Sequence, residues 1–393
     1  MLSLLSEKDN QVTLITMSVG MSMKSWIKAG IIQRELAYYK ALSTHVGRLC
    51  FLTYAQHLPS EKKILNHFIP DASIVCRNSR FFSRVPSGYF MASFIPHLNN
   101  NTFKSIHLVR SNQISGSWSG LSIARQKKIP FILRCGYLLS KNIQLVYPSS
   151  ALKKNMMRAL EKWVAKNANA IIVTYSGAKK YLIDHYDIQP EKITVIGNPI
   201  DIHLFSPKNA LSQTKRDILF IGRFTPEKNI HSILLACQQS KASITLLGKG
   251  PLKQEMIEYA RSLNLNANFI DYMPNSEIPK LMSNHRLFII ASYFEGNPKA
   301  LLEAMSCEMP CIASQIPEHK ELIVHEKDGL LAPHDAEGLS KAIHIGLNNL
   351  SFCDALGKNA RIKILQDFSM NSNALKEYSL HQKVLMSYYN HTQ

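Results

Sequence analysis

The pattern that most constrains the fold is the alternation of short apolar runs with longer amphipathic segments. Residues 12–19 (VTLITMSV) are largely apolar, as is typical of a strand buried on both faces, and residues 25–42 have helical periodicity. Strands that alternate with helices indicate a parallel sheet covered by helices on both faces. Further strands are expected at residues 48–55, 105–112, 130–137 and 170–176, and further helices at residues 118–128 and 156–168.

The second half of the chain repeats this pattern after a break. Residues 198–215 contain two prolines and polar residues without a helical period, so we expect a linker there. From Asp217 onward one strand recurs roughly every 25–30 residues, which is the spacing of βαβ units. The α/β pattern therefore predicts two doubly wound, Rossmann-like domains that face a cleft, residues 1–197 and 198–368. In this half, strands are expected at residues 217–224, 243–250, 267–273, 287–293 and 310–314, and helices from Asn229, Pro251, Ser276 and Pro298.

Charge divides the chain into two unequal halves. Residues 1–200 carry 26 of the 46 Lys and Arg residues and 9 of the 28 Asp and Glu residues, an excess of 17 positive charges. Residues 201–393 carry the other 20 and 19, an excess of 1. This asymmetry indicates different partners for the two halves, because a general solubility charge would not be confined to one of them.

Three features predict a cytoplasmic protein. No run reaches the roughly 18 consecutive apolar residues of a membrane-spanning helix. The first residues, MLSLLSEKDNQ, become charged too early for a secretory signal. The seven cysteines are scattered and odd in number, which favours free thiols in a reducing compartment.

The segment SYFEGNPKALLEAMSCEMPCIAS, residues 292–314, carries the strongest functional signal. Glu295 lies on the turn after an expected strand, and Glu303 projects from the helix that follows. The start of this helix, where backbone N–H groups favour an anion, comprises Asn297, Pro298, Lys299 and Ala300. Two carboxylates and a phosphate cradle match the sugar hydroxyls, ribose and diphosphate of a nucleotide-sugar. The alternative is that both glutamates are surface residues, with Glu303 on a solvated helix face.

A second cluster lies after the first strand of this domain. Gly222 and Arg223 end the strand, and Lys228 opens the next helix in the sequence GRFTPEKN. Two cations on a glycine turn can bind a diphosphate and stabilise the charge on a departing phosphate. Gly248, in LLGKGP, marks another turn from strand to helix. The alternative for Arg223 and Lys228 is that they are ordinary surface cations.

In their order and spacing these segments resemble the family-4 retaining glycosyltransferases (glycosyl transferases group 1), which have the GT-B fold. The similarity covers residues 160–380. The matching motifs are VIGNPIDIHLFSP, GRFTPEKN, LLGKGP, EGNPKALLE, PEHKELIVHEKDGLL and LQDFSMNSNALKEY.

The resemblance implies a role for each matching residue. Arg223 and Lys228 would bind the donor diphosphate, Glu295 the hydroxyls of the transferred sugar, and Glu303 the ribose. The final helix, within residues 369–393, would cross back onto the first domain. The resemblance also implies retention of anomeric configuration, no metal and no cofactor besides the nucleotide-diphosphate sugar substrate. The sequence is consistent with transfer that needs no metal, because no Asp-x-Asp pair lies at a strand end.

The first domain resembles the family less closely. Gly20 follows the first strand, but the tight glycine pair of the family is missing. Where the family often has a histidine that contacts the sugar, this chain has Arg134 and Tyr137, so one of these is expected to face the cleft. A structural ion pair is the alternative for Arg134. Arg110 and Asn112 lie at the end of another expected strand and are candidates to bind acceptor hydroxyls or phosphates.

The expected helix at residues 156–168 and the residues just before it carry a regular series of cations. Lys and Arg side chains recur every four residues and share one helical face, while Met157, Leu160 and Val164 share another. The cations are Lys154, Arg158, Lys162 and Lys166. They form either a solvated face or a contact with anionic lipid head groups, to which each cation contributes roughly 1 kcal/mol.

The leading hypothesis is transfer of a sugar to a glycan or lipid-linked acceptor in cell-surface polysaccharide synthesis, at the inner face of the membrane. The resemblance implies same-face attack in which the leaving phosphate takes the acceptor proton. A double displacement is not supported, because no pair of catalytic carboxylates is evident. A nucleic-acid-binding protein is the first alternative, but the basic half lacks a recognition motif, so we expect no nucleic-acid partner. A Rossmann oxidoreductase is the second, but neither half has G-x-G-x-x-G after its first strand.

Overall fold

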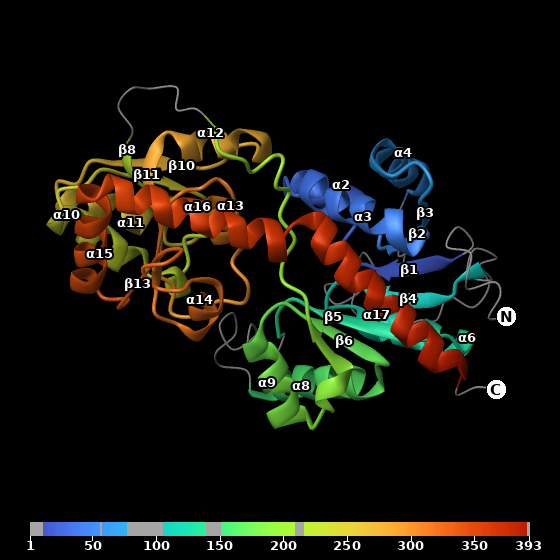
Figure 1. Cartoon of the computed structure of the whole chain (residues 1–393). Helices are drawn as coiled ribbons and strands as arrows, with labels where there is room; N and C mark the ends of the chain where they lie inside the picture. The colour runs from blue at the N-terminus through green and yellow to red at the C-terminus, as the bar shows by residue number, and fades with distance from the viewer. Residues whose placement is uncertain (1–10, 56, 77–104, 139–150, 209–215, 391–393) are drawn as a thin grey trace. The chain divides into compact units, whose positions relative to one another are not determined.

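The computed structural model describes residues 11–55, 57–76, 105–138, 151–208 and 216–390 (Figure 1). The chain divides into two compact units: unit 1 is residues 1–197 with 373–393, and unit 2 is residues 198–372. The sequence placed the corresponding boundaries at residues 197/198 and 368/369. Each unit is a parallel α/β structure, which confirms the predicted pair of Rossmann-like domains.

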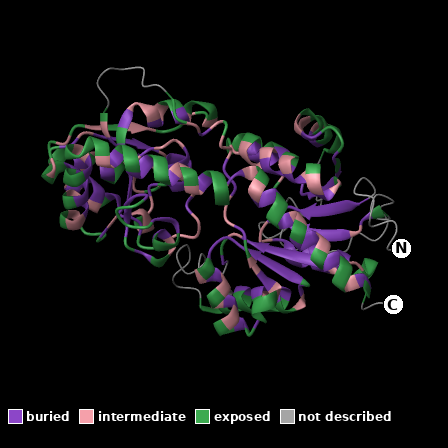
Figure 2. Ribbon diagram, viewed as in Figure 1, coloured by how far each residue is buried: buried purple, intermediate pink, exposed green. Residues whose placement is uncertain are grey.

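The described part of unit 1 contains a seven-stranded parallel sheet in the order β3-β2-β1-β4-β5-β6-β7. The inner strands β1, β4, β5 and β6 are buried along their whole length, as is typical of a parallel sheet with both faces covered (Figure 2). The strand order reverses between β1 and β4, whose carboxyl ends therefore flank a topological switch point. The strands are β1 (Val12–Thr16), β2 (Arg48–Thr53), β3 (Ser73–Cys76), β4 (Leu108–Ser111), β5 (Phe131–Cys135), β6 (Ala170–Val173) and β7 (Ile193–Val195).

Helices cover both faces of this sheet. Alternate strand residues face opposite ways, so Leu133 and Ile171 join one hydrophobic core while Ile132 and Ile172 pack with Leu385 of α17 (Met370–Asn390) on the other face. The other helices are α2 (Met23–Lys28), α3 (Ile32–Val46), α4 (Leu58–Phe68), α6 (Ser117–Lys127), α8 (Ala151–Asn167), α9 (Ser176–Tyr186) and the 3-10 turn η4 (Pro190–Lys192).

The predicted helix at residues 25–42 is two helices, α2 and α3. Gly30 has a φ of 70°, in the left-handed region, and breaks the hydrogen-bonded ladder between them. Apolar periodicity continues across the break, so it could not reveal it.

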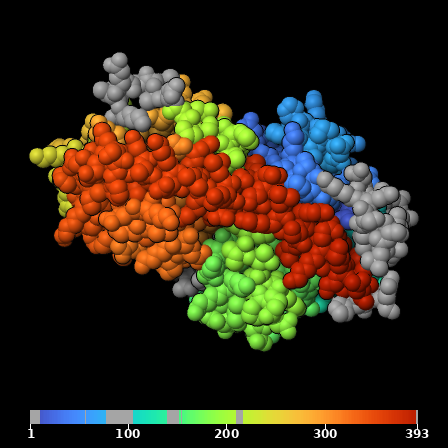
Figure 3. Space-filling view, in the orientation of Figure 1, coloured from blue at the N-terminus to red at the C-terminus, as the bar shows by residue number. Residues whose placement is uncertain are grey.

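A buried ion pair fastens α17 to the rest of unit 1. Arg110, on β4, has its Nε 2.8 Å from Oε1 of Glu377, and each side chain is 1% exposed. Arg110 Nη2 and Tyr38 Oη donate to Glu377 Oε2 at 3.0 and 2.7 Å. The outer side of α17 (red) is uncovered in the space-filling view (Figure 3). The predicted return of the last helix to the first domain is confirmed.

Unit 2 contains a six-stranded parallel sheet in the order β10-β9-β8-β11-β12-β13 among its described residues. Its switch point lies between β8 and β11. The strands are β8 (Arg216–Ile221), β9 (Ile244–Leu247), β10 (Ala267–Ile270), β11 (His285–Ile290), β12 (Cys311–Ser314) and β13 (Leu330–Ala332). The helices are η5 (Pro226–Lys228), α10 (Ile230–Gln239), α11 (Lys253–Ser262), η6 (Asn275–Glu277), α12 (Ile278–Ser283), α13 (Lys299–Ser306), α14 (Pro317–Leu322), α15 (Ala336–Asn348) and α16 (Leu350–Asp367).

The chain enters and leaves unit 2 side by side. Ile200 N donates to Phe368 O at 2.8 Å, and Met370 N donates to Ile200 O at 3.1 Å. These bonds form an isolated parallel bridge between Ile200 and Ser369.

Candidate functional site

The candidate donor site is built by two loops that flank the switch point of unit 2. One loop follows β8 and includes Lys228, and the other follows β11 and includes Glu295. The two strands pair in parallel, so their carboxyl ends lie at the same edge of the sheet. Tyr293 N donates to Glu227 O at 2.9 Å and ties the loops together.

Lys228 and Glu295 meet directly across the two loops. The Lys228 ammonium forms an ion pair with Glu295 Oε1, and the side chains are 14% and 11% exposed. Ser292 Oγ donates to the same Oε1 at 2.7 Å. The structure therefore brings together the cation and the carboxylate that the sequence assigned to the donor diphosphate and the transferred sugar.

Arg223 lies on the same turn as Lys228 but is far more exposed. Its side chain is 75% exposed, and its Nη2 lies 3.2 Å from Glu227 Oε1. Thr225 Oγ1 donates to that carboxylate oxygen at 2.7 Å, which anchors Glu227 as a partner for Arg223. An exposed guanidinium on a fixed turn can move towards a phosphate without unpacking the core.

The two predicted glycines, Gly222 and Gly248, lie where adjacent strand ends approach closely. A Cβ on Gly248, which has a φ of 149°, would lie 1.9 Å from Gly222 O, so no other residue fits there. Packing alone therefore accounts for Gly248, and its contact with a donor stays a prediction.

Residues 295–298, the EGNP loop, lead into α13. Pro298 is the N-cap residue rather than a member of the first turn, and α13 begins at Lys299, followed by Ala300. Asn297 is held by Asn198, whose N donates to Asn297 Oδ1 and whose Nδ2 donates to Asn297 O, both at 2.7 Å. The helix start thus has a fixed position, as an anion site requires.

Glu303 is buried, at 4% exposure, so the alternative that it lies on a solvated helix face is wrong. Burial, followed by the nearby carboxylate of Glu303, raises the pKa of the Cys307 thiol to about 12. A carboxylate kept inside the unit close to the EGNP loop fits a binding role better than a solubility role.

Sequence reasoning missed Asn229, which connects both loops. Asn229 adopts a left-handed backbone, with φ 51°, and is buried. Its Nδ2 donates to His334 O at 2.7 Å, and its Oδ1 accepts from Tyr293 Oη at 2.9 Å. Asparagine tolerates this conformation, but in the sequence it resembled an ordinary helix start.

Sequence reasoning also missed His319, on α14, which is completely buried. Its imidazole contacts Ser314 at the end of β12. Burial lowers the pKa of His319, and the charges of Glu295 and Lys228 also act on it. No periodicity or glycine turn marked this residue.

In unit 1 the structure corrects one predicted acceptor residue. Arg110 is bound to Glu377 and 1% exposed, so it holds α17 and is not available to an acceptor. Its Nη1 donates to Tyr39 Oη at 2.7 Å, and that hydroxyl donates to Asn112 Oδ1 at 2.6 Å. Asn112 is buried and part of this network, although it follows β4 at the switch point.

The other predicted residues of unit 1 lie at carboxyl ends of strands. Gly20, with φ 77°, lies on the turn after β1. Arg134 is buried near the end of β5, and Tyr137 follows that strand and is 37% exposed. Their contacts with an acceptor stay predictions.

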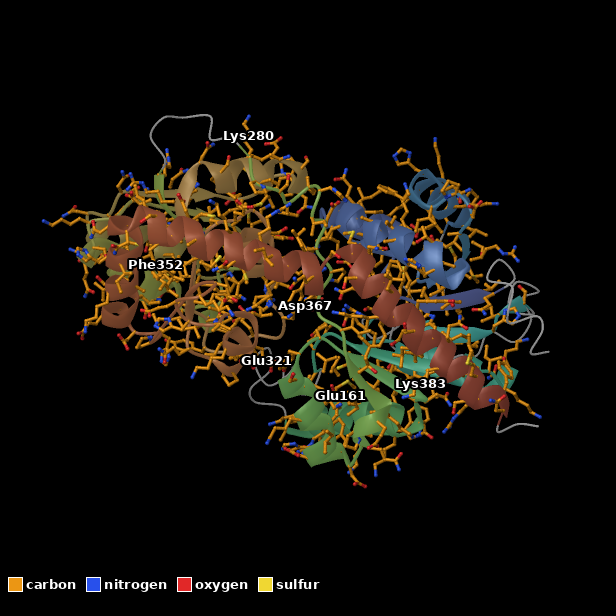
Figure 4. The ribbon with its side chains drawn as sticks, viewed as in Figure 1. Glu161, Lys280, Glu321, Phe352, Asp367 and Lys383 are labelled. Atoms are coloured by element: carbon orange, nitrogen blue, oxygen red, sulfur yellow. The ribbon has the colours of Figure 1, made fainter. Side chains whose placement is uncertain are left out.

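The predicted cations lie on α8, where Arg158, Lys162 and Lys166 are exposed and Lys154 is partly buried. Lys166 also lies 3.6 Å from Asp187. The opposite face packs inward through Met157, Val164 and Glu161, which is labelled in Figure 4 and accepts a 2.9 Å hydrogen bond from Tyr186 Oη.

The structure adds a second apolar face to α8 that the periodicity argument missed. Leu152, Met156 and Trp163 are 84%, 51% and 42% exposed. Their spacing places them on one helical stripe, next to the stripe of cations. An exposed apolar stripe beside cations is typical of a helix that lies in a membrane interface.

The described residues contain neither a membrane-spanning helix nor a metal-binding cluster. None of the helices there is both long and apolar enough to cross a bilayer. In the same ranges, no three His, Cys, Asp or Glu side chains are grouped so as to hold a metal ion.

Comparison with known families matches both halves of the chain. Residues 51–204 match the family "Glycosyltransferase Family 4", and residues 201–363 match "Glycosyl transferases group 1". Together the matches span both units.

Two curated relatives are bacterial glycosyltransferases. The chain is 26% identical over 249 residues to UDP-Gal:alpha-D-GlcNAc-diphosphoundecaprenol alpha-1,3-galactosyltransferase of Escherichia coli, covering 58% of this chain and 62% of that protein. It is 26% identical over 244 residues to N-acetylgalactosamine-N,N'-diacetylbacillosaminyl-diphospho-undecaprenol 4-alpha-N-acetylgalactosaminyltransferase of Campylobacter jejuni, covering 57% and 65%. The match thus spans less than two thirds of either relative.

Solved structures show the same fold. Sucrose-phosphate synthase from Thermosynechococcus elongatus superposes with a TM-score of 0.75 at 19% identity, covering 96% of this chain and 100% of that one. Anabaena HepE in complex with UDP gives a TM-score of 0.73 at 15% identity, covering 95% and 100%. The family matches, the two parallel-sheet units and these neighbours agree, and the chain therefore belongs to the family-4 glycosyltransferases and has their GT-B fold.

Proposed function

We propose that the protein transfers a sugar from a nucleotide-diphosphate sugar to a lipid-linked or glycan acceptor, with retention of anomeric configuration. The observation that carries this proposal is the contact between Lys228 and Glu295 at the switch point of unit 2, with Arg223 on the same turn. Two cations and a carboxylate thus lie in one cluster. A nucleotide-sugar can match both kinds of group, because its diphosphate binds cations and its sugar hydroxyls donate hydrogen bonds to a carboxylate.

The electrostatics of the site favour departure of a phosphate. Lys228 is largely buried, so its charge is screened less by water than that of a surface lysine. Arg223 is exposed and can form a bidentate contact with phosphate oxygens. Both cations stabilise negative charge that develops as the bond between the anomeric carbon and the diphosphate breaks.

Retention follows if the acceptor oxygen attacks the face that the diphosphate leaves. The new bond joins the acceptor oxygen to the anomeric carbon, and the leaving phosphate oxygen takes the acceptor proton. Arg223 and Lys228 supply the charge that a divalent metal supplies in other transferases, so we propose that transfer needs no metal.

Two observations support a lipid-linked, anionic acceptor. The names of the Escherichia coli and Campylobacter jejuni relatives both specify undecaprenol-linked diphosphate acceptors. Residues 1–200 carry 17 excess positive charges, 26 minus 9, and part of this excess lies on the exposed face of α8. We propose that unit 1 binds the cytoplasmic face of an anionic membrane peripherally, through α8, and receives its acceptor there.

The deciding experiment is a thermal unfolding series of the full chain with UDP, GDP, NAD⁺ and a single-stranded oligonucleotide. A nucleoside diphosphate should stabilise the protein by about 2.7 kcal/mol at a hundredfold excess over its Kd. Transfer is then measured with UDP-glucose, UDP-galactose, UDP-GlcNAc, UDP-GalNAc and GDP-mannose as donors and undecaprenyl-diphosphate sugars as acceptors. Stabilisation by NAD⁺ or the oligonucleotide alone, with no transfer from any donor, would overturn the proposal.

A further inference from the structure

A buried histidine lies behind the loop that presents Glu295. His319 is 0% exposed and lies on the short helix α14, five residues after Ser314. The strand that ends at Ser314, β12, is the neighbour of β11, and Ile290 pairs with Ala313. The imidazole therefore lies close to the two strand ends that support the Glu295 loop.

The contacts of His319 fix its tautomer. Its Nδ1 is 2.9 Å from Ser314 O and 3.2 Å from Ser314 Oγ. A carbonyl oxygen only accepts hydrogen bonds, so Nδ1 carries the proton. Burial lowers the pKa of the imidazole, which keeps the ring neutral and leaves a lone pair on Nε2. Among the described residues, Nε2 has no hydrogen-bond partner.

A continuous path of hydrogen bonds leads from His319 to the donor site. Ser314 Oγ donates to Ser292 O at 2.6 Å, and Ser292 Oγ donates to Glu295 Oε1 at 2.7 Å. Ser292 and Ser314 are both completely buried, so water does not compete for these bonds. The path ends on the carboxylate oxygen that Lys228 contacts.

We propose that His319 is a positioning residue of the donor site, which fixes Ser314 and, through Ser292, the carboxylate of Glu295. This inference rests on the proposed function, in which Glu295 binds hydroxyls of the transferred sugar. A neutral imidazole suits this place because it donates a hydrogen bond without adding a second cation beside Lys228. A lysine or arginine would compete with Lys228 for Glu295.

The test compares three substitutions of His319. In His319→Asn the amide nitrogen takes the place of Nδ1 and can donate to Ser314 O, whereas in His319→Gln it takes the place of Nε2. His319→Leu removes both nitrogens. For each variant, the affinity is measured for the donor that the wild-type protein uses fastest among the five nucleotide-sugars and for the free nucleoside diphosphate of that donor.

The expected signature is selective loss of sugar recognition. His319→Leu and His319→Gln should weaken binding of the nucleotide-sugar about tenfold and that of the free diphosphate less than about twofold, because in the proposed function the sugar is the part of the donor that Glu295 binds. His319→Asn should stay within about threefold of the wild type. Equal losses of affinity for both ligands would mean that His319 is merely structural. The same conclusion would follow if His319→Asn melted like the wild type but lost as much affinity for the nucleotide-sugar as His319→Leu.

A double-mutant cycle with Ser292→Ala tests the path itself. If His319 acts through Ser292, His319→Leu should change the affinity for the nucleotide-sugar less than about twofold in the Ser292→Ala background. Additive losses would overturn the path. The two proposals fail separately: a wild-type protein inactive with all five donors sinks the proposed function, whereas an active protein unaffected by His319→Leu sinks only this inference.

Discussion

The ion pair between Arg110 and Glu377 gives the sharpest test of how α17 is held. The perturbation is Glu377→Gln, which keeps the shape of the side chain and removes its charge. The Glu377 carboxylate accepts hydrogen bonds from both Arg110 and Tyr38. Glutamine has only one acceptor oxygen and no charge. The guanidinium would then be left buried without a counterion.

The expected cost is large because both partners are buried. Removal of one member of a buried ion pair costs about 3–5 kcal/mol, and both side chains are 1% exposed. Apolar contacts of Leu380, Val384 and Leu385 remain, so the helix should still dock. A loss of about 3 kcal/mol corresponds to local opening of α17 on the order of a hundredfold more often.

The pair also predicts a pH dependence. Burial raises the pKa of Glu377, but Arg110, and then His381 and Tyr38, outweigh burial and hold the pKa well below its usual range. Because the folded-state pKa is depressed, the contribution is present above the ordinary carboxyl value of about 4.3 and is lost as pH falls below it. Between the unfolded-state and the folded-state pKa of Glu377, the free energy of unfolding should fall by about 1.4 kcal/mol per pH unit. Glu377→Gln should lack this pH dependence.

Hydrogen exchange measured by mass spectrometry checks these values locally. Peptides from residues 373–390 should exchange about a hundredfold faster in Glu377→Gln, while peptides from unit 2 serve as an internal reference. Lys383→Gln is the matched control, because it removes an exposed charge from the same helix (Figure 4) and should change stability by less than about 0.5 kcal/mol. If α17 in Glu377→Gln exchanges like the control, the ion pair does not hold the helix.

Three further predictions concern the proposed activity and its location. Lys228→Ala should lower transfer at least about a hundredfold, roughly 2.7 kcal/mol, with the fold intact, and near-normal turnover in a well-folded variant would refute its role at the diphosphate. Transfer should survive EDTA, and a loss restored by Mg²⁺ or Mn²⁺ would show that a metal serves the phosphate. Co-sedimentation with anionic liposomes should weaken with salt, since surface charges are screened over about 8 Å at physiological ionic strength. Arg158→Glu with Lys162→Glu should lower that binding, and Trp163→Ser should lower the part that persists at high salt. Equal binding to neutral liposomes would contradict the proposed surface.

The fold could be predicted because its determinants are local and repeated. Apolar runs such as residues 287–293 recur at the spacing of βαβ units, and that recurrence specifies a parallel sheet. The break between α2 and α3 was missed because it depends on the backbone of Gly30, not on the apolar period. Residue type alone does not reveal whether a glycine bends the chain.

The candidate site could be predicted only where residues lie in contiguous motifs. Lys228 and Glu295 each follow a strand, and neighbouring strands bring them together as expected. Arg110 also lies near the end of a strand, but its partner Glu377 lies 267 positions away, so the sequence could not distinguish a ligand-binding residue from a buried ion pair. His319 and Asn229 lie inside matched motifs, but their roles depend on hydrogen bonds to residues of other elements, and the motifs do not reveal those partners.

The bridge between Ile200 and Ser369 has a consequence for the integrity of the chain. The polypeptide passes between units twice, and the two passages are stitched together by hydrogen bonds at 2.8 and 3.1 Å. The two ends of unit 2 are thus held together by backbone hydrogen bonds. A protease that cut one passage would leave the other intact, and the two fragments would stay associated. The same closure makes Ile200 and Ser369 suitable points for a linker in a circularly permuted form of unit 2 alone.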